Sequence, residues 1–266
     1  MKTLSLAVIG KDVSQSTSPQ MHSFIAREMG NGINYIRLSL PEEQFEGSAE
    51  GLFEKFDGFN ITIPYKLWIM PHLKNIVGDA KVFGAVNTVK SADKSGYNTD
   101  GLGFWLMLKT NGISVFGKRV LVLGAGGAGR SVAYKLKENG AQVFIYDNNQ
   151  QSAQAVAREF SLTALSEVVP ENYYLIVNAT GVGMHKSVGI SPVDGNILQN
   201  CEVAVDLIYT PKKSRFLEIA ESLNKKTVNG EAMLFYQAYY AQCIYFNLNA
   251  DEAQAKRLFE KYSKEN

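Results

Sequence analysis

Residues Val120–Leu136 read VLVLGAGGAGRSVAYKL, and this stretch decides the fold. It opens with a dense apolar run of the kind that forms a strand buried on both faces of a parallel sheet. Gly124, Gly126 and Gly129 follow with the spacing GxGxxG, and apolar residues then recur at helical intervals. A strand, a glycine loop and a helix in this order are typical of a dinucleotide-binding α/β unit.

Each glycine has an expected role in such a loop. Gly124 permits the tight turn, Gly126 lets the backbone approach a pyrophosphate, and Gly129 lets the helix pack closely on the strand. The phosphates would lie at the helix N-terminus, beside Gly127 and Ala128, where free N–H groups and the helix dipole favour negative charge. The simpler alternative is a glycine-rich turn that binds no ligand.

Strand-like and helical patterns alternate along most of the chain on both sides of this stretch. Strands are expected at residues 4–9, 33–40, 59–63, 119–123, 142–146, 175–178 and 203–208, with a hairpin formed by 85–90 and 95–98. Helices are expected after Pro19, after Pro41, at 101–111, up to Glu138, and at 231–246 and 250–262. This alternation predicts an α/β protein with mainly parallel sheets.

Length and composition narrow the class of protein. A chain of 266 residues forms one large or two small domains. With 27 basic and 26 acidic residues the net charge is +1, which does not favour a nucleic-acid partner. No apolar stretch approaches the ~18 residues that span a bilayer, and Cys201 and Cys243 form no cysteine framework. We therefore expect a soluble, cytoplasmic protein without a membrane partner.

Four polar clusters precede the glycine loop, and each is expected to follow an apolar strand. They are 16–19 (STSP), 60–66 (NITIPYK), 84–88 (GAVNT) and 98–101 (NTDG). Because ligands of open α/β sheets bind at the carboxyl ends of strands, these side chains are expected to converge on one polyhydroxylated small molecule. Taken singly, Ser18 and Asp100 are equally explained as helix caps, and Lys66 as a solvated surface lysine.

Together the clusters resemble the motifs of the shikimate dehydrogenase family. The family motifs SxSP, NVTxPxK, GAVNT and NTDGxG read STSP, NITIPYK, GAVNT and NTDGLG here, in the same order. The resemblance continues through GAGGAG, NATGVGM at 178–184, DLIYTP at 206–211 and NGEAMLFYQA at 229–238. It implies an N-terminal α/β substrate domain (1–101) to which the C-terminal helices (236–266) return, and a Rossmann-type NAD(P)-binding domain (102–235).

The resemblance also implies an activity and roles for particular residues. The activity is the reversible reduction of 3-dehydroshikimate to shikimate, in the pathway of aromatic amino-acid biosynthesis. Lys66 matches the catalytic lysine and Asp100 its partner, while Ser16 and Ser18 match the hydroxyls that bind the substrate carboxylate. The residues around the substrate ring would be Asn60, Thr62, Asn87, Thr99, Asp100 and Gln237, with Tyr209 near the carboxylate. The cofactor would contact Gly124, Gly126, Gly127, Ala128, Gly129, Thr180, Gly230 and Met233.

Lys66 and Asp100 suit this chemistry. An ammonium group can stabilise the developing alkoxide and give it a proton, and Asp100 can orient that ammonium by a charge-assisted hydrogen bond. A nearby carboxylate favours the charged lysine, which suits reduction but makes Lys66 a poorer base for oxidation. Which of the two residues transfers the proton is left open. No histidine suits this role as well, and no cluster of His, Cys and carboxylate residues has metal-ligand spacing, so no metal is expected.

Two alternatives to this function are kept. A quinate/shikimate dehydrogenase that uses NAD in catabolism would share the fold and the chemistry. Ser18 favours shikimate over quinate, because family members that prefer quinate often carry threonine at this position. A non-catalytic relative that only senses the ligand is disfavoured because Lys66 and Asp100 are both present.

The choice between NAD and NADP is predicted from the end of the second Rossmann strand. Asp147, followed by Asn148, lies near the offset of about 20 residues from the glycine loop at which an acid binds the adenosine ribose of NAD. Because a carboxylate there would repel the 2′-phosphate of NADP, we expect a preference for NAD, with NADP as the alternative. In that alternative Asp147 points to solvent and Arg130 binds the phosphate.

Overall fold

The computed structural model describes residues 3–265 of the chain. The chain divides into two compact units, the first formed by Met1–Gly103 and Phe235–Asn266 and the second by Phe104–Leu234. The divisions fall inside helices α4 (Asp100–Thr110) and α9 (Glu231–Phe246). Within residues 3–265, no helix is both long enough and apolar enough to cross a membrane.

In the described part of the first unit, six strands form one mixed sheet in the order β2-β1-β3-β5-β6-β4. The strands are β1 (Leu4–Gly10), β2 (Ile33–Ser39), β3 (Gly58–Ile61), β4 (Asn75–Ile76), β5 (Thr88–Lys90) and β6 (Ser95–Tyr97). β1 pairs in parallel with β2 and β3, whereas β5 runs antiparallel to both β3 and β6. The β5–β6 pair is the predicted hairpin, in shorter strands.

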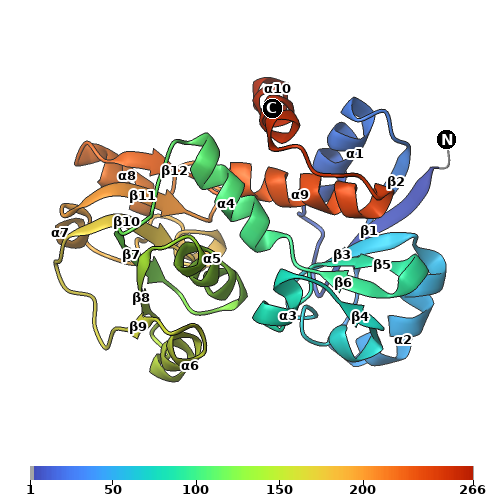
Figure 1. Cartoon of the computed structure of the whole chain (residues 1–266), viewed down its shortest axis with the longest axis horizontal. Helices are drawn as coiled ribbons and strands as arrows, with labels where there is room; N and C mark the ends of the chain where they lie inside the picture. Colours follow the sequence, from blue (N-terminus) through green and yellow to red (C-terminus); the bar gives the residue numbers. More distant parts are fainter. Residues whose placement is uncertain (1–2, 266) are drawn as a thin grey trace. The chain divides into compact units, whose positions relative to one another are not determined.

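Helices cover both faces of this sheet (Figure 1). They are α1 (Ser18–Glu28), α2 (Glu42–Lys55), α3 (Asp79–Phe83) and α10 (Glu252–Glu265), together with α9 and the short turns η1 (Met70–His72) and η2 (Ser91–Asp93). On one face Phe45 of α2 and Ala80 of α3 pack with Phe59 of β3. On the opposite face Tyr245 of α9 packs with Val8 and Tyr35. Strand residues therefore alternate between two apolar layers, as the pleat requires.

The second unit contains a parallel sheet, in which six strands of residues 104–234 have the order β12-β11-β10-β7-β8-β9. The strands are β7 (Arg119–Leu123), β8 (Gln142–Tyr146), β9 (Thr163–Ala164), β10 (Tyr173–Asn178), β11 (Cys201–Asp206) and β12 (Lys226–Val228). Renumbered within the unit, this order is 6-5-4-1-2-3, that of a Rossmann fold. The predicted fold class is confirmed. The order reverses between β7 and β10, which is where such sheets bind ligands.

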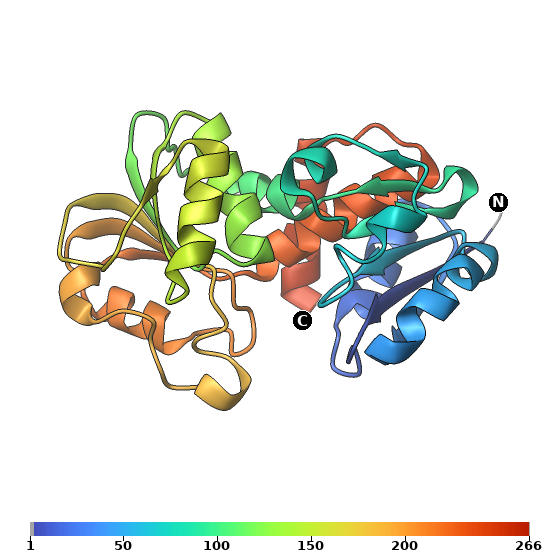
Figure 2. The ribbon, with the colours of Figure 1, turned by 90° about the horizontal axis from the view of Figure 1, so that it is seen from below.

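The helices of the second unit lie in two layers about its sheet (Figure 2). They are α5 (Gly127–Glu138), α6 (Gln150–Phe160), α7 (Gly195–Leu198) and α8 (Arg215–Ser222), with the short turn η3 (His185–Ser187). Leu121 and Leu123 of β7 pack in one buried cluster with Leu198 of α7 and Phe216 of α8. Every residue of the β7 run after Arg119 is buried, as its apolar sequence predicts.

Candidate active site

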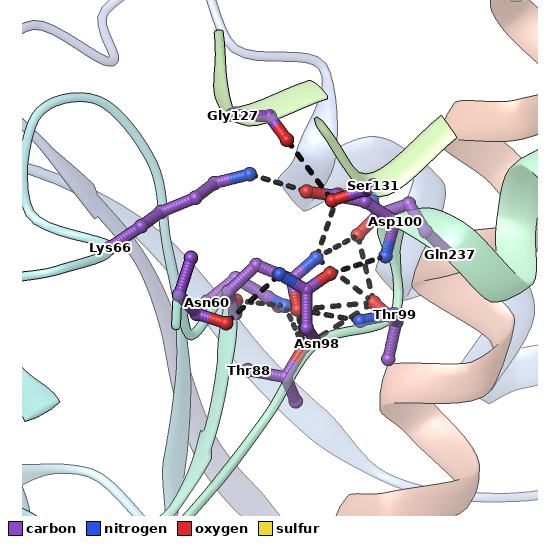
Figure 3. Close-up of polar contacts among 11 residues, drawn as sticks. Asn60, Lys66, Thr88, Asn98, Thr99, Asp100, Gly127, Ser131 and Gln237 are labelled. Carbon is purple, nitrogen blue, oxygen red and sulfur yellow. Dashed lines mark hydrogen bonds and ion pairs between the residues drawn. The ribbon is translucent and has the colours of Figure 1, made fainter. Parts of the chain in front are cut away.

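Lys66 and Asp100 form an ion pair in the first unit (Figure 3). The Lys66 Nζ atom lies 2.5 Å from Asp100 Oδ2, and the side chains are 23% and 13% exposed. Lys66 follows β3 in a tight turn, and its carbonyl accepts a hydrogen bond from the Val86 N–H. A partly buried, charge-assisted hydrogen bond of this kind fixes the direction of the Lys66 side chain.

Asp100 is held by two asparagines. The Asn98 side-chain oxygen accepts the Asp100 backbone N–H at 3.0 Å, and the buried Asn98 amide donates to the Ala85 carbonyl. Asn87 Nδ2 donates to the second carboxylate oxygen of Asp100, Oδ1, at 2.8 Å. The carboxylate therefore has one oxygen on Asn87 and the other on Lys66. Asn98 lies in the NTDG motif, but the sequence alone gives it no role, because an Asx turn at a helix start is common.

Thr99 and Gln237 complete this group. The Thr99 N–H donates to Asn87 Oδ1 at 2.9 Å, and its hydroxyl lies 3.3 Å from the side-chain oxygen of Gln237 on α9. Asn87 Nδ2 is 3.5 Å from the same Gln237 oxygen. Five of the predicted residues are thus brought together from separate parts of the sequence.

The cluster at 84–88 reaches this group by a route that the sequence pattern did not predict. It does not follow an apolar strand; it follows α3 and leads into β5. Because β5 runs antiparallel to β3, with Asn60 opposite Thr88, the start of β5 lies at the same edge of the sheet as the end of β3. The expectation that every cluster follows a strand is wrong here, although the resulting convergence is as expected.

Ser16 and Ser18 form a second polar group in the first unit. Both are half-buried at the start of α1, and the Ser16 hydroxyl donates to that of Ser18 at 3.0 Å. Ser18 is the first residue of α1, and the Thr17 N-cap makes no side-chain capping bond. Arg37, which sequence reasoning missed, donates to the Ser16 carbonyl at 2.7 Å and fixes this loop. The two hydroxyls are therefore adjacent, as a carboxylate-binding pair would be.

Asn60 and Thr62 were both predicted to contact the substrate. Thr62 is half-buried just after β3. Asn60 lies within β3, is 7% exposed, and has each of its amide atoms engaged with two protein groups. Its side chain therefore has little capacity left for a ligand.

The glycine loop of the second unit is a tight turn that is packed on one side and open on the other. Gly124 has a φ of +101°, which only glycine adopts readily, and a Cβ at Gly129 would lie 2.0 Å from the Gly124 carbonyl oxygen. In contrast, a Cβ at Gly126 or Gly127 would meet nothing within 4 Å. The loop is thus closely packed on its helix side and open at the N-terminus of α5, which also holds Ala128. These residues fit a dinucleotide pyrophosphate.

Asp147 follows β8, and both of its carboxylate oxygens accept backbone N–H groups. Oδ2 accepts the Ala125 N–H at 2.7 Å and Oδ1 that of Asn149 at 2.8 Å. Asn148 is exposed and accepts the Tyr146 hydroxyl. Arg130 is ion-paired with Glu159 and stacks over the Phe160 ring at 4.9 Å. Asp147 therefore ties the two loops together rather than presenting two free oxygens.

Thr180, Gly230, Met233 and Tyr209 also belong to the second unit. The Thr180 N–H and hydroxyl both donate to Asn178 Oδ1, at 3.1 and 2.6 Å. A Cβ at Gly230 would lie 2.0 Å from the Leu207 carbonyl oxygen, so Gly230 packs tightly beside the residues that follow β11. Met233 is buried and Tyr209 is half-buried.

A buried carboxylate, Asp206, organises these loops. It accepts Asn178 Nδ2 and the Ile208 N–H, each at 3.0 Å, as well as the Ser214 hydroxyl. Burial raises the pKa of the Asp206 carboxyl, and the three donors oppose that effect. Asp206 lies in the DLIYTP motif, but only the fold shows that it joins β10 to β11. Among the described residues, no group of three or more His, Cys, Asp or Glu side chains is placed to hold a metal ion.

Comparison with known proteins adds family information to this geometry. Residues 8–89 match the family model of the shikimate dehydrogenase substrate binding domain. Residues 82–183 match that of the D-isomer specific 2-hydroxyacid dehydrogenase NAD binding domain. A shikimate dehydrogenase (NADP(+)) of Carboxydothermus hydrogenoformans is 36% identical over 254 residues, with 90% of each chain covered. That of Thermus thermophilus is 37% identical and covers 93% of this chain and 94% of the relative.

A solved structure of a shikimate dehydrogenase is also similar to this chain. The shikimate 5-dehydrogenase of Thermus thermophilus in complex with NADP(H) and shikimate has a TM-score of 0.88 and 36% identity. The match covers 97% of this chain and 99% of the other.

These relatives contradict the expected preference for NAD. Both sequence relatives are named as NADP(+) enzymes, and the solved relative holds NADP(H). The prediction rested on the negative charge of Asp147 alone; in the folded chain each of its carboxylate oxygens also accepts a backbone N–H, from Ala125 and from Asn149. The identity of the residue at the strand tip was therefore a poor guide to its role.

Proposed function

Because this chain belongs to the shikimate dehydrogenase family, we propose that it catalyses the reversible reduction of 3-dehydroshikimate to shikimate with NADPH. The observation that carries the proposal is the position of Lys66, in an ion pair with Asp100 and beside Asn87, Thr99 and Gln237. A cation, a carboxylate and three neutral hydrogen-bonding side chains suit a substrate with a ketone and neighbouring hydroxyls.

We assign the first unit to the substrate and the second to the cofactor. The Ser16 and Ser18 hydroxyls bind the substrate carboxylate, and Asn87, Thr99 and Gln237 bind the ring hydroxyls. In the second unit, the open side of Gly126 and Gly127 supports placing the cofactor pyrophosphate at the start of α5. Ala128, Thr180 and Met233 line the remaining cofactor path in this proposal.

The chemistry assigned to Lys66 follows from its charge. Bound NADPH supplies the hydride that is added to the ketone carbon. Lys66 donates a proton from Nζ to the oxygen that gains the negative charge, which leaves a hydroxyl group and a neutral amine. Asp100 keeps the ammonium directed, and it does so with one oxygen while Asn87 holds the other. The lysine regains its proton from water before the next turnover.

The test is the rate at which the absorbance of reduced cofactor appears, in four reactions that combine shikimate or quinate with NADP⁺ or NAD⁺. We expect the shikimate–NADP⁺ reaction to have the highest kcat/KM. Quinate carries an additional hydroxyl on the carbon that bears the carboxylate. Since Ser16 and Ser18 are proposed to bind that carboxylate, we expect quinate to be a poorer substrate than shikimate. No turnover of shikimate with either cofactor would refute the proposed function.

We place this activity in the cytoplasm, as for other biosynthetic dehydrogenases that act on dissolved metabolites. Fractionation of cells that express the full chain checks this, since the enzyme should be recovered with cytoplasmic markers.

A further inference from the structure

Asn60 is a hydrogen-bonded hub inside the first unit, and its bonding pattern is complete. Asn60 Nδ2 donates to the Asn87 carbonyl at 3.2 Å and to the Thr88 hydroxyl at 3.0 Å. Asn60 Oδ1 accepts the Tyr35 hydroxyl at 2.8 Å and the Tyr245 hydroxyl at 3.0 Å. A side-chain amide has two N–H donors and two acceptor positions, and all four are used.

The orientation of the Asn60 amide follows from its partners. The Asn87 backbone carbonyl can only accept, so the Asn60 atom that faces it must be the nitrogen. The oxygen then faces the two phenols, which must donate. Burial raises the pKa of Tyr35 and of Tyr245 well above the usual value, so both phenols keep their protons. Two hydroxyls therefore hold this amide in one of its two flip states.

That orientation is transmitted to the ion pair through Thr88 and Asn87. The Thr88 hydroxyl accepts a hydrogen from Asn60, so its own hydrogen is directed to Asn87 Oδ1, 2.9 Å away. The Thr99 N–H reaches the same oxygen. The nitrogen of the Asn87 amide therefore faces Asp100 Oδ1, which leaves Asp100 Oδ2 for Lys66. Figure 3 shows Asn60, Thr88, Thr99 and Asp100 linked in this way.

We propose that Tyr35 and Tyr245 are positioning residues for the reaction. Their hydroxyls orient Asn60, which acts through Thr88 and Asn87 to direct the Asp100 carboxylate and so the Lys66 ammonium. In this proposal Asn60 contacts no substrate. The inference rests on the proposed function for its effect on turnover, but the hydrogen-bond chain itself exists without substrate.

The test compares Tyr35→Phe, Tyr245→Phe and the double variant with the control Tyr239→Phe. Tyr239 is also a buried tyrosine on α9, but its hydroxyl bonds with Asp251 and Gln254 instead. Either single variant leaves Asn60 Oδ1 one donor, so kcat should fall only slightly. The double variant removes both donors and should lower kcat about ten-fold, the effect of one well-placed hydrogen bond. KM for shikimate should change much less, because the variants leave unchanged the Ser16 and Ser18 hydroxyls that are proposed to bind the substrate carboxylate.

A second readout needs no substrate. The side-chain amide protons of Asn87, followed by nuclear magnetic resonance in the ligand-free protein, should exchange with solvent faster in the double variant than in the wild type or in Tyr239→Phe. If the double variant does not fold, Thr88→Val interrupts the same chain between Asn60 and Asn87 and should lower kcat similarly. Wild-type kcat and unchanged Asn87 exchange in the folded variants, or an effect on KM alone, would overturn the inference. An inactive wild type with normal Asn87 protection would refute the proposed function only.

Discussion

At the scale of single residues, Asn60 and Asp147 are side chains that a motif assigns to a ligand and that also bond within the protein. Both residues lie where a motif predicts a ligand contact, and both have their polar atoms engaged by the protein. The partners of Asn60 include Tyr35 and Tyr245, which lie 25 and 185 residues away in the sequence. No local pattern reveals such contacts, so sequence could identify these positions but not their roles.

Ser16 and Ser18 yield a prediction about binding. Replacing either serine by alanine removes a hydrogen bond to the charged substrate carboxylate, worth about 1.5–3 kcal/mol. KM for shikimate should therefore rise about ten-fold or more, with kcat little changed. Ser14→Ala is the matched control, because Ser14 is an exposed serine of the same loop. Steady-state kinetics of the three variants checks this, and an unchanged KM in both Ser16→Ala and Ser18→Ala places the carboxylate elsewhere.

His22 yields a prediction about pH. It is fully buried on α1, stacks on Tyr35 at 4.4 Å, and burial lowers its pKa to about 3 from 6.5. Between these two values the unfolded chain binds a proton that the folded chain does not. The free energy of unfolding should therefore fall as the pH drops from 6.5 towards 3, by up to about 1.4 kcal/mol per pH unit from this residue.

The variant His22→Phe isolates this effect, since it keeps the ring stacked on Tyr35 and removes the titration. It leaves Gln242, which bonds His22 Nδ1 at 2.8 Å, without that partner, so a loss of stability at every pH is expected as well. The diagnostic result is a shallower pH dependence in urea unfolding measured between about pH 6 and pH 4. An identical slope in wild type and variant would show that His22 does not control it.

At the scale of helices and strands, the sequence predicts elements well where one pattern dominates and poorly where pairing direction matters. The apolar run of β7 and the glycines before α5 are both found as expected. The antiparallel β5 is short, and its direction depends on the β6 hairpin and on pairing with β3. That direction brings Asn87 to the site. The strand β12 has only Lys226–Val228 and was not predicted, because it is too short for a periodic signal.

The glycine loop provides a prediction at this scale. Gly129→Ala should lower Tm by several degrees, because its Cβ would lie 2.0 Å from the Gly124 carbonyl oxygen and push α5 away from β7. Gly126→Ala is the matched comparison, since its Cβ would meet no protein atom within 4 Å. It should keep the wild-type Tm but bind NADP⁺ at least about ten-fold more weakly, because the methyl group occupies the side from which the pyrophosphate approaches. Thermal unfolding and calorimetric titration measure both, and equal effects of the two variants would contradict these roles.

At the scale of the whole molecule, two sheets of different construction follow from the distribution of sequence patterns. Apolar strands that alternate with helices gave the parallel sheet of Phe104–Leu234, and the short strands near the four polar clusters gave the mixed sheet of the first unit. The convergence of Lys66, Asn87 and Asp100 was predictable from motif order and family resemblance. The NADP named for the relatives was not, because the expectation of NAD rested on the identity of one residue, Asp147.

The most direct test of the catalytic role of Lys66 is the turnover of Lys66→Ala with shikimate and NADP⁺. Calorimetric titration with shikimate and a thermal unfolding curve of the same variant report its binding and its folding. Lys11→Ala, which removes another lysine–carboxylate pair of the same unit, is the control and should keep wild-type turnover. If Lys66 transfers the proton, Lys66→Ala will fold and bind shikimate nearly as the wild type does while kcat falls by about 10²–10⁴. A folded Lys66→Ala enzyme with a kcat close to that of the wild type would contradict the assignment of the catalytic site.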